Sequence, residues 1–330
     1  MPKEITHFAL ARQLRYRLPQ GSPFYEPVRT FPLLFRLGAI APDIPFFYLA
    51  GPHKRKVQAI SRHYHRTDGE ALRPLLQFLD THKSPKALAL AAGVVCHLVT
   101  DTVFHPMVFY FAGMDGVHPG ATGRHRQFET AMDLHFHHLY KEDPYVYRLV
   151  NSVEIPRPEL NGLLADLFSE KTASGDQELF RALSGALDWF MSIQYLFRNA
   201  LIRQTASLCE RTRHPLPAKA SGVIYPFPGP VALPFFNGRL RYRHPISGER
   251  INTCLADLVK KTVDSSLGLL DHISIAAGSG LPLTGMSVTC AGQALVLPDL
   301  PPGRVQFWCQ KTALTTDLYK GMPRDGRPPF

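Results

Sequence analysis

Residues 86–104 read KALALAAGVVCHLVTDTVF, a run that is rich in alanine and apolar on almost every side. Ser84 and Pro85 stand directly before it, and this pair is a common start signal for a helix. A helix that is apolar nearly all round belongs in a protein interior rather than on its surface. The stretch therefore predicts a buried core helix that ends at about Phe104.

Three polar residues interrupt this apolar pattern at intervals of four: His97, Asp101 and His105. This spacing places them on one helix face, with neighbours ~6 Å apart along the axis. His97 and His105 are then about 12 Å apart, too far to share one ion, so the row suits a site with several metals bridged by Asp101. The alternative is a polar stripe packed against other polar groups, which is costly in an apolar helix if the groups stay unpaired. The pattern therefore favours metal binding.

The other periodic segments predict a mainly α protein with many helices. We expect a helical domain over residues 1–275 and a short C-terminal appendage over residues 276–330. The expected elements are helices near 4–17, 124–141, 177–211 and 251–275, short helical pieces at 30–49, a Pro-rich extended surface segment or linker at 214–234, and two or three short β-strands within 283–310.

The composition bounds the class of protein. With 45% hydrophobic and 19% charged residues in 330, the chain can bury a core and is not intrinsically disordered. No apolar run reaches the ~18 residues that span a bilayer, and no signal peptide is evident, so we expect no integral membrane protein. Five scattered cysteines without a CxxC pair indicate a reducing cytoplasm. The net charge of +10 favours anionic partners such as phosphate esters, nucleic acid or an acidic membrane surface.

Further candidate ligands lie outside the core helix, where twelve of the fifteen histidines fall within the first 138 residues. His125 and Glu129 form an i, i+4 pair that a solvated helix face would equally explain, and Asp133 continues the same face and could orient a ligand. The remaining candidates are Asp43 in GAIAPDIPF, which could also be a simple turn aspartate, one of His63 and His65 in SRHYHRTDG, and His7 after Thr6.

Five of these motifs occur in a characteristic order: THF, GAIAPDI, the HxH segment, HLVTDTVFHP and HRQFE. In this the chain resembles the zinc-dependent phospholipase C-like proteins, which are related to the bacterial phosphatidylcholine-preferring phospholipases C and the S1/P1 nucleases. The resemblance covers residues 2–140 well, the later helices loosely and the C-terminal tail hardly at all. It implies a multi-helix fold of the phospholipase C/P1 nuclease type with two or three zinc ions.

The resemblance also implies a role for each candidate residue. His97, Asp101 and one of His63 and His65 would hold the first zinc, with Asp43 beside it as ligand or general base. His65 is preferred because it directly precedes the RTDG segment. The remaining implied ligands are His105, His125 and Glu129 for the second zinc, and His7 with bridging Asp101 for the third.

Two features depart from the secreted relatives. The step from Asp101 to His105 is four residues here and six there, although the intracellular branch has a similar HxxxDxxxHP form. The N-terminal tryptophan that completes the third site in the secreted enzymes is missing. Met1 is followed by Pro2, whose small size permits removal of the methionine. We therefore expect Pro2, five positions before His7, to offer its amine and carbonyl to the third metal.

The expected reaction is hydrolysis of a phosphoester by metal-bound hydroxide with Asp43 as base, since zinc lowers the pKa of bound water from 15.7 to about 7. A phospholipid is the first-choice substrate, with peripheral contact to an anionic membrane. The alternatives are a nuclease or nucleotidase on the same metal framework and a non-catalytic metal-binding protein. Residues 46–48 and 107–111 could supply either an apolar lip for lipid or stacking platforms for bases. His135, His137 and His138 lie outside the motifs and are predicted to be surface or packing residues.

Overall fold

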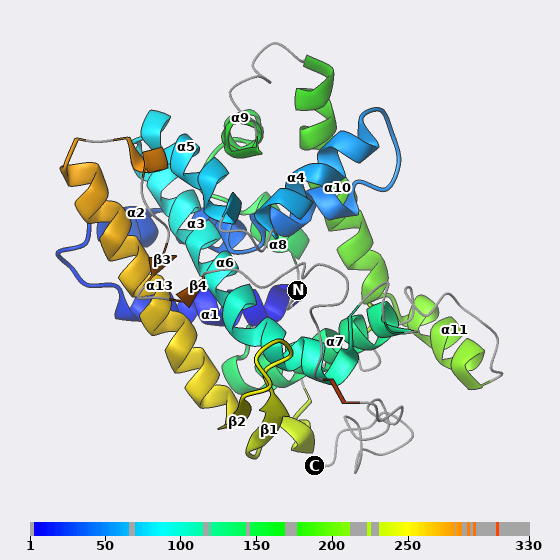
Figure 1. The fold of residues 1–330 in the computed structure, drawn as a ribbon. Coiled ribbons are helices and arrows are strands. Elements are labelled where there is room, and N and C mark those ends of the chain that lie inside the picture. The colour runs from blue at the N-terminus through cyan, green and yellow to red at the C-terminus, as the bar shows by residue number, and fades with distance from the viewer. Residues whose placement is uncertain are drawn as a thin grey trace.

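The fold of this protein, taken from a computed structural model, is mainly α, as the sequence predicts (Figure 1). The structure describes residues 3–65, 70–114, 118, 120–142, 146–168, 177–211, 223–225, 231–280, 282–285, 289–290, 293–294 and 308–309. Within these ranges the helices are α1 (Glu4–Arg17), α2 (Tyr25–Thr30), α3 (Pro32–Gly38), η1 (Ala41–Phe47), α4 (Lys54–Tyr64), η2 (Glu70–Leu72), α5 (Arg73–Thr81), α6 (Pro85–Ala112), α7 (Ala121–Tyr140), α8 (Val146–Asn151), α9 (Arg157–Phe168), α10 (Gln177–Phe197), α11 (Ala200–Arg211), η3 (Pro234–Phe236), α13 (Leu255–Gly278) and η4 (Leu283–Gly285).

Helix α6 is the predicted core helix, and α1, α3, α7 and α13 pack around it. Ser84 caps it by accepting a hydrogen bond from the Ala87 backbone N–H, and Gly113 ends it at φ +79°. It is long and apolar enough by composition to cross a membrane, but 89% of its most apolar window is buried inside the protein. Its position is therefore that of a core helix, and the absence of a membrane span stays a prediction.

The backbones of α3 and α6 approach each other closely at Gly38 and Gly93. A Cβ atom at Gly93 would overlap the Phe35 carbonyl oxygen, and one at Gly38 would overlap the Leu90 carbonyl oxygen. Only glycine fits such a crossing. As a result, the turn that follows α3 lies directly against the middle of α6, one helical turn before His97.

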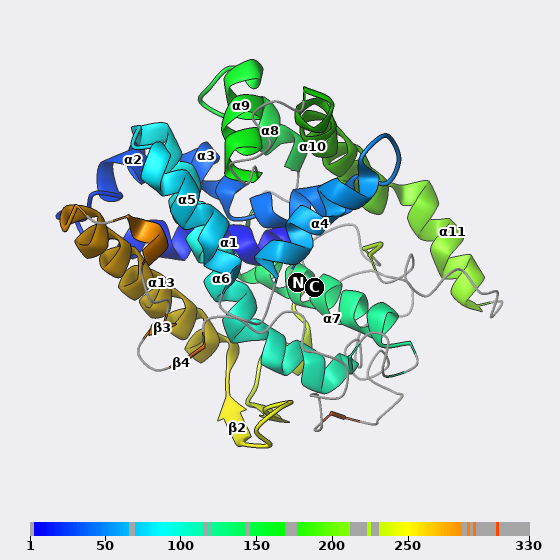
Figure 2. The ribbon, with the colours of Figure 1, turned by 45° about the horizontal axis from the view of Figure 1, so that its top comes forward.

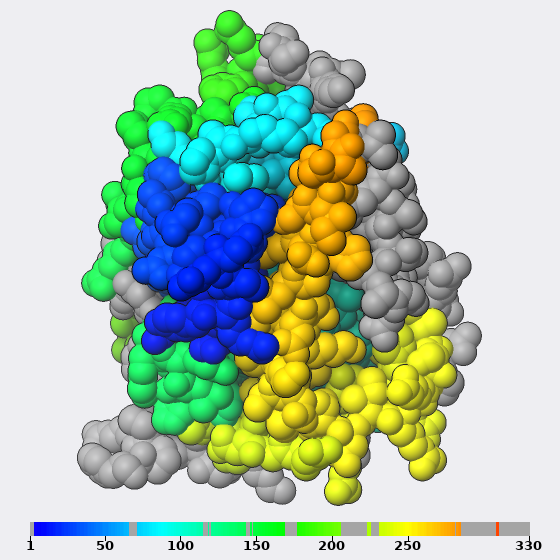
Figure 3. Space-filling model, turned by 90° about the vertical axis from the view of Figure 1, so that its left-hand side faces the viewer, coloured from blue at the N-terminus to red at the C-terminus, as the bar shows by residue number. Residues whose placement is uncertain are grey.

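Helix α13 covers the outer side of the N-terminal helices. Figure 3 shows it lying lengthwise beside the blue N-terminal segment, with α5 above and α7 below. Its first turn carries a capping box, in which Cys254 is the N-cap and Asp257 bonds back to the Cys254 backbone N–H. The helix therefore closes the core on the side away from α4 and α10 (Figure 2).

Three predicted elements differ from the structure in extent. Helix α6 continues beyond Phe104 and through Pro106 to Ala112, because the buried packing of its last turns outweighs one lost backbone hydrogen bond. The single helix expected over 177–211 is two helices. The side chain of Asn199 caps the second one by accepting from the backbone N–H groups of Leu201 and Ile202 at 2.9 and 3.3 Å.

The third difference is a β-hairpin before α13, where a helix was expected to begin at residue 251. Strands β1 (Leu240–Arg243) and β2 (Arg250–Thr253) pair antiparallel, with Leu240 opposite Thr253. The short strands β3 (Thr289–Cys290) and β4 (Gln293–Ala294) pair within the region where strands were expected. Most of the Pro-rich stretch lies outside the described residues, and the domain boundary at residue 275 stays a prediction.

Candidate metal centre

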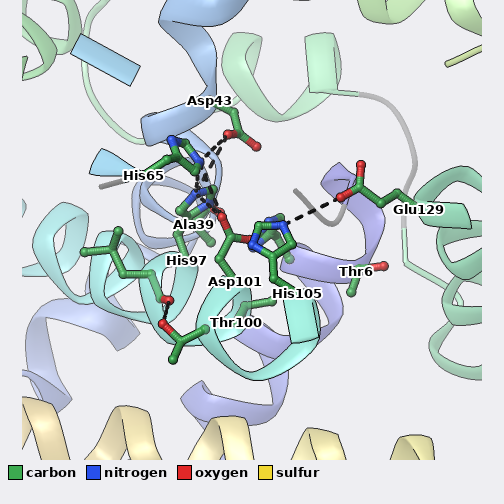
Figure 4. Close-up of polar contacts among 12 residues, drawn as sticks. Thr6, Ala39, Asp43, His65, His97, Thr100, Asp101, His105 and Glu129 are labelled. Atoms are coloured by element: carbon green, nitrogen blue, oxygen red, sulfur yellow. Dashed lines mark hydrogen bonds and ion pairs between the residues drawn. The ribbon is translucent and has the colours of Figure 1, made fainter. Parts of the chain in front are cut away.

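Eight side chains that the sequence singles out converge on one buried centre, and Figure 4 labels six of them: Asp43, His65, His97, Asp101, His105 and Glu129. They come from five separate elements, so tertiary packing rather than local sequence brings them together. The contributors are His7 from α1, Asp43 from η1, His65 at the C-cap of α4, His97, Asp101 and His105 from α6, and His125 and Glu129 from α7. Which of them bind metal stays a prediction.

The first group consists of His65, His97 and Asp101, whose ligand atoms lie within 4.8 Å of one another. Asp101 Oδ2 is 3.3 Å from His65 Nε2 and 3.5 Å from His97 Nε2, and the two Nε2 atoms are 3.4 Å apart. His65 Nε2 also lies 3.2 Å from Asp43 Oδ1. His63 belongs to no such group among the described residues, so the geometry favours His65 of the two.

The second group consists of His105, His125 and Glu129. Glu129 Oε1 lies 2.7 Å from His125 Nε2 and 3.8 Å from His105 Nε2. Thus the i, i+4 pair on α7 does not face solvent but turns toward the end of the histidine row on α6.

His7 stands between these groups, and its ring stacks on that of His97 at 4.3 Å. Its Nε2 lies 3.5 Å from Asp101 Oδ1, which agrees with a bridging role for Asp101. His7 also forms a possible ligand group with Asp43 and His97. Pro2, the expected further ligand of this third position, lies outside the described residues.

Two imidazoles of the centre are oriented by backbone carbonyls. His97 Nδ1 donates to the Ala39 carbonyl at 2.9 Å, and His65 Nδ1 donates to the Ser61 carbonyl at 2.6 Å. Each bond fixes the ring and leaves the Nε2 lone pair for a metal. The Ala39 carbonyl is available because the Gly38–Gly93 crossing brings the end of α3 against α6.

Several buried polar atoms at the centre make no hydrogen bond with the described part of the chain. They are both ring nitrogens of His7, both ring nitrogens of His105, both carboxylate oxygens of Asp101, and Asp43 Oδ1. Leaving such atoms unsatisfied is costly unless a ligand pairs them. Nitrogen and carboxylate donors without thiolate suit zinc in a hydrolytic site, so the residues present fit this metal.

The protonation states also favour metal binding. Burial lowers the pKa of His7 and of His105 to about 4, so both rings are neutral at pH 7. Burial opposes ionisation of Asp101, but the surrounding imidazoles, His105 and His97 foremost, hold its pKa well below the usual range. Burial raises the pKa of Asp43, against the effect of the nearby His65 ring. Burial opposes the charged form of His65, but its contacts with Asp101 and Asp43 raise its pKa to about 10, so a metal at this position would displace a proton from the ring. His7 and His105 are neutral, and the central carboxylate of Asp101 is ionised.

Asp133 contacts the first turn of α1, next to the candidate ligand His7, and its expected role in orienting a ligand stays a prediction. Its carboxylate accepts from the backbone N–H groups of Ile5 and Thr6 at 3.1 and 2.8 Å and from the Thr6 hydroxyl at 2.6 Å. It also accepts from the Tyr225 hydroxyl at 2.8 Å. Asp133 thus holds the first turn of α1, directly before His7.

Sequence reasoning missed Tyr225, because only the fold brings it to a partner 92 positions away. Among the three histidines predicted to lie outside the site, His135 is a packing residue. It is 1% exposed, and its Nδ1 accepts from the Leu233 backbone N–H at 3.1 Å.

A family model described as zinc-dependent phospholipase C matches residues 6–177, slightly more than half of the chain. The chain belongs to this family. The resemblance seen in the sequence is thereby confirmed, and the matched span contains all eight side chains of the centre. Searches of curated proteins and of solved structures found no match to the chain. Membership in the zinc-dependent phospholipase C family supports a metal-dependent hydrolase of the phospholipase C type.

Proposed function

We propose that this protein is a zinc-dependent phosphodiesterase that cleaves a phospholipid between glycerol and phosphate. The proposal rests on one observation in a chain of this family. The buried ring nitrogens of His7 and His105 and the buried carboxylate oxygens of Asp101 make no hydrogen bond with a described residue, so they are free to bind metal. His65, His97 and Asp101 would hold one zinc, and His105, His125 and Glu129 a second. A third zinc beside His7 and Asp101 is part of the proposal.

Bound zinc would supply a Lewis acid that neutralises phosphoryl charge and acidifies a water molecule. The chain supplies orientation and a base. Asp43 lies at the edge of the centre with 8% of its surface exposed, and its raised pKa suits a group that accepts a proton near neutral pH. Its contact with His65 holds the carboxylate toward the first group.

Aromatic rings border the centre and would exclude water from it. The Phe46 ring lies 5.2 Å from that of His65, and the Phe109 ring lies 5.3 Å from those of His105 and His125. The other residues expected in an apolar lip mostly pack elsewhere: Phe47 contacts Phe190, and Met107 is fully buried. Phe46 and Phe109 are thus the members of the predicted lip that flank the metal groups.

A nuclease or nucleotidase on the same framework is the second candidate, because these two rings could also stack on bases. A catalytically silent metal-binding protein is the third candidate, and activity measurements exclude or establish it.

We place the protein in the cytoplasm, on the basis of its cysteine pattern, with peripheral contact to membranes.

The test is an assay of the zinc-loaded protein on phosphatidylcholine, on single-stranded DNA and on a soluble phosphate monoester, each with and without chelator. We expect chelator-sensitive release of phosphocholine from the lipid to be fastest. An Asp43→Asn variant should lose most turnover while His65, His97 and Asp101 still hold zinc. Faster hydrolysis of DNA would establish the nuclease instead, and no turnover on any substrate would leave the non-catalytic function.

A further inference from the structure

Part of the chain between Asp43 and His65 is exposed and belongs neither to the core nor to the metal groups. Residues 49–52 read LAGP and are all exposed, with Leu49 at 48%. Helix α4 follows at once and exposes Lys54, Arg55, Lys56 and Arg62 to solvent. We name residues 49–52 together with these four cations the α4 surface. It joins an apolar tip to a basic helix face.

The charges on this surface are unfavourable for the helix that carries them. Lys54, Arg55 and Lys56 occupy the first turn of α4, and no acidic residue accompanies them there. Cations at a helix N-terminus oppose the helix dipole, where an acidic residue would stabilise it. Lys54, Arg55 and Arg62 make no ion pair with a described residue. Glu178 of α10 contacts the N-cap residue His53 at 3.0 Å, but it makes no ion pair with Lys54 or Arg55. An external anionic partner could therefore still pair with these cations.

Helix α10 packs against the residue that leads into the apolar tip, and it carries an exposed tryptophan. Trp189 on α10 is 39% exposed and stands one helical turn beyond Gly185. A Cβ at Gly185 would lie 3.6 Å from the Tyr48 ring, so this part of α10 lies against the residue that precedes Leu49. Figures 1 and 2 show the loop before α4 projecting beside α10 at the edge of the molecule. Tryptophan is enriched where proteins meet the headgroup region of a bilayer.

The α4 surface is continuous with the metal centre at both of its ends. Helix η1, which carries Asp43 and Phe46, leads into this surface. At the other end, the last residue of α4 is followed by His65. Eleven residues of α4 span about 16 Å, so Arg62 lies near His65 and the apolar tip lies farther out. A partner bound along the length of this surface therefore also reaches the end of α4 at which His65 lies.

We propose that the α4 surface docks on an anionic phospholipid bilayer, with residues 49–52 entering the headgroup region and the cations of α4 contacting acidic lipids. This inference rests on the proposed phospholipase function, because it presents the centre to lipid that lies in a membrane. Charge complementarity and the apolar tip support it together. A nucleic acid would pair with the cations but would gain nothing from the exposed apolar tip.

The experiment measures sedimentation of the zinc-loaded protein with vesicles of phosphatidylcholine alone and of equimolar phosphatidylcholine and phosphatidylglycerol. Incubation is brief and in the cold, so that little lipid is turned over. The test variants are Lys54→Glu with Arg55→Glu, and separately Leu49→Ser. The matched control is Arg241→Glu with Arg250→Glu on the hairpin, which changes net charge equally at two other exposed positions. Acidic residues in the first turn of α4 suit its dipole, so the test variant should fold.

We expect the wild type to prefer the anionic vesicles and the Lys54/Arg55 variant to lose at least about tenfold in partitioning, since each cation near such a surface contributes about fivefold. Leu49→Ser should weaken binding to the same vesicles, and the hairpin control should bind as the wild type does. Equal losses in the two charge variants would overturn the proposal in favour of nonspecific attraction. Vesicle binding that Leu49→Ser leaves unchanged, with single-stranded DNA bound through Lys54 and Arg55, would overturn it in favour of a polyanion surface.

Turnover of a soluble short-chain phosphatidylcholine separates this inference from the proposed function. The Lys54/Arg55 variant should hydrolyse it at the wild-type rate, because neither residue belongs to the centre. If the wild type binds vesicles through the α4 surface yet cleaves no phosphoester, the proposed function fails and the docking surface stands. If it cleaves the soluble substrate but its vesicle binding ignores the α4 surface, the docking surface fails alone.

Discussion

His97 contacts several other members of the centre as well as the backbone at the end of α3. Its ring stacks on His7, its Nε2 faces His65 and Asp101, and its Nδ1 donates to Ala39. One carboxylate oxygen of Asp101 lies 3.5 Å from His7 Nε2, and the other lies 3.3 Å from His65 Nε2. The centre therefore depends on these two residues more than on any at its edge.

Replacing His97 or Asp101 by alanine should remove zinc and activity together. We expect a loss of more than about 100-fold in zinc affinity, because the groups that merely orient a ligand are already worth 10–100-fold. His138→Ala, on the same helix as Glu129 but outside the centre, is the control and should keep both properties. Elemental analysis of the purified variants measures this, and full zinc content in His97→Ala would refute the ligand assignment.

Tyr225→Phe tests whether Asp133 positions His7. The change removes the hydroxyl donor at 2.8 Å from Asp133 and keeps the ring under the Lys3 ammonium at 3.8 Å. We expect a stability loss of about 1–3 kcal/mol and weaker binding of the zinc nearest His7. Tyr242→Phe is the matched control, a buried tyrosine whose hydroxyl has no hydrogen bond within the described chain.

Zinc competition against a chromophoric chelator and a thermal melt measure the two effects. A Tyr225→Phe protein that matches Tyr242→Phe in both properties would show that the hydroxyl does not position His7.

The sequence could not have predicted the contact between Tyr225 and Asp133. The i, i+4 spacing within α6 and α7 identifies ligands that one helix presents together, whereas Asp133 and Tyr225 meet only through the tertiary fold.

At the scale of elements, the crossing of α3 and α6 supports the centre from outside. Gly38 and Gly93 allow the two backbones to touch, and the carbonyl of Ala39 then reaches His97. The hydrogen bond between Ala39 and His97 therefore depends on glycine, which has no side chain, at positions 38 and 93.

Gly93→Ala should destabilise the protein by about 1–3 kcal/mol, because the added methyl group forces α3 away from α6. The same displacement moves Ala39 from His97, so zinc affinity should fall with stability. Gly268→Ala in α13 is the control, since a Cβ there meets nothing within 4 Å and alanine favours a helix. Denaturant melts and zinc titration of both variants measure the difference; equal stability of the two would contradict a close-packed crossing.

The sequence predicted α6 from its nearly continuous apolar composition and α10 from its regular apolar period, and it also predicted α1 and α7. The prediction from sequence was wrong where tertiary packing outweighs the preference of a single residue. Pro106 reads as a helix end but lies inside a buried helix, while Asn199 reads as one more polar residue and caps a new helix. The β1–β2 hairpin escaped notice because four-residue strands leave too short a pattern.

At the scale of the whole molecule, the metal centre occupies the interior that α1, α3, α6 and α7 enclose. His7, His97, Asp101 and His105 are each at most 2% exposed. A bound ion that pairs with these buried polar groups would stabilise the core. Zinc should therefore contribute to the folding free energy of the entire domain.

Removing zinc with a chelator should lower the melting temperature by at least about 5 °C, because an ion present at about 1,000 times its dissociation constant adds about 4 kcal/mol. Adding zinc back should restore it, while magnesium should not, since magnesium prefers oxygen ligands over imidazole. Scanning calorimetry measures the shift. An unchanged melting temperature after verified removal of metal would contradict a centre built into the core.

The most direct test is anomalous diffraction from crystals of the zinc-loaded protein, with data collected on both sides of the zinc absorption edge. Two peaks are predicted, one about 2.0–2.2 Å from the ligand atoms of His65, His97 and Asp101, and one at the same distance from those of His105, His125 and Glu129. A third beside His7 would complete the centre. Zinc peaks confined to surface histidines, with none among these six residues, would contradict the account.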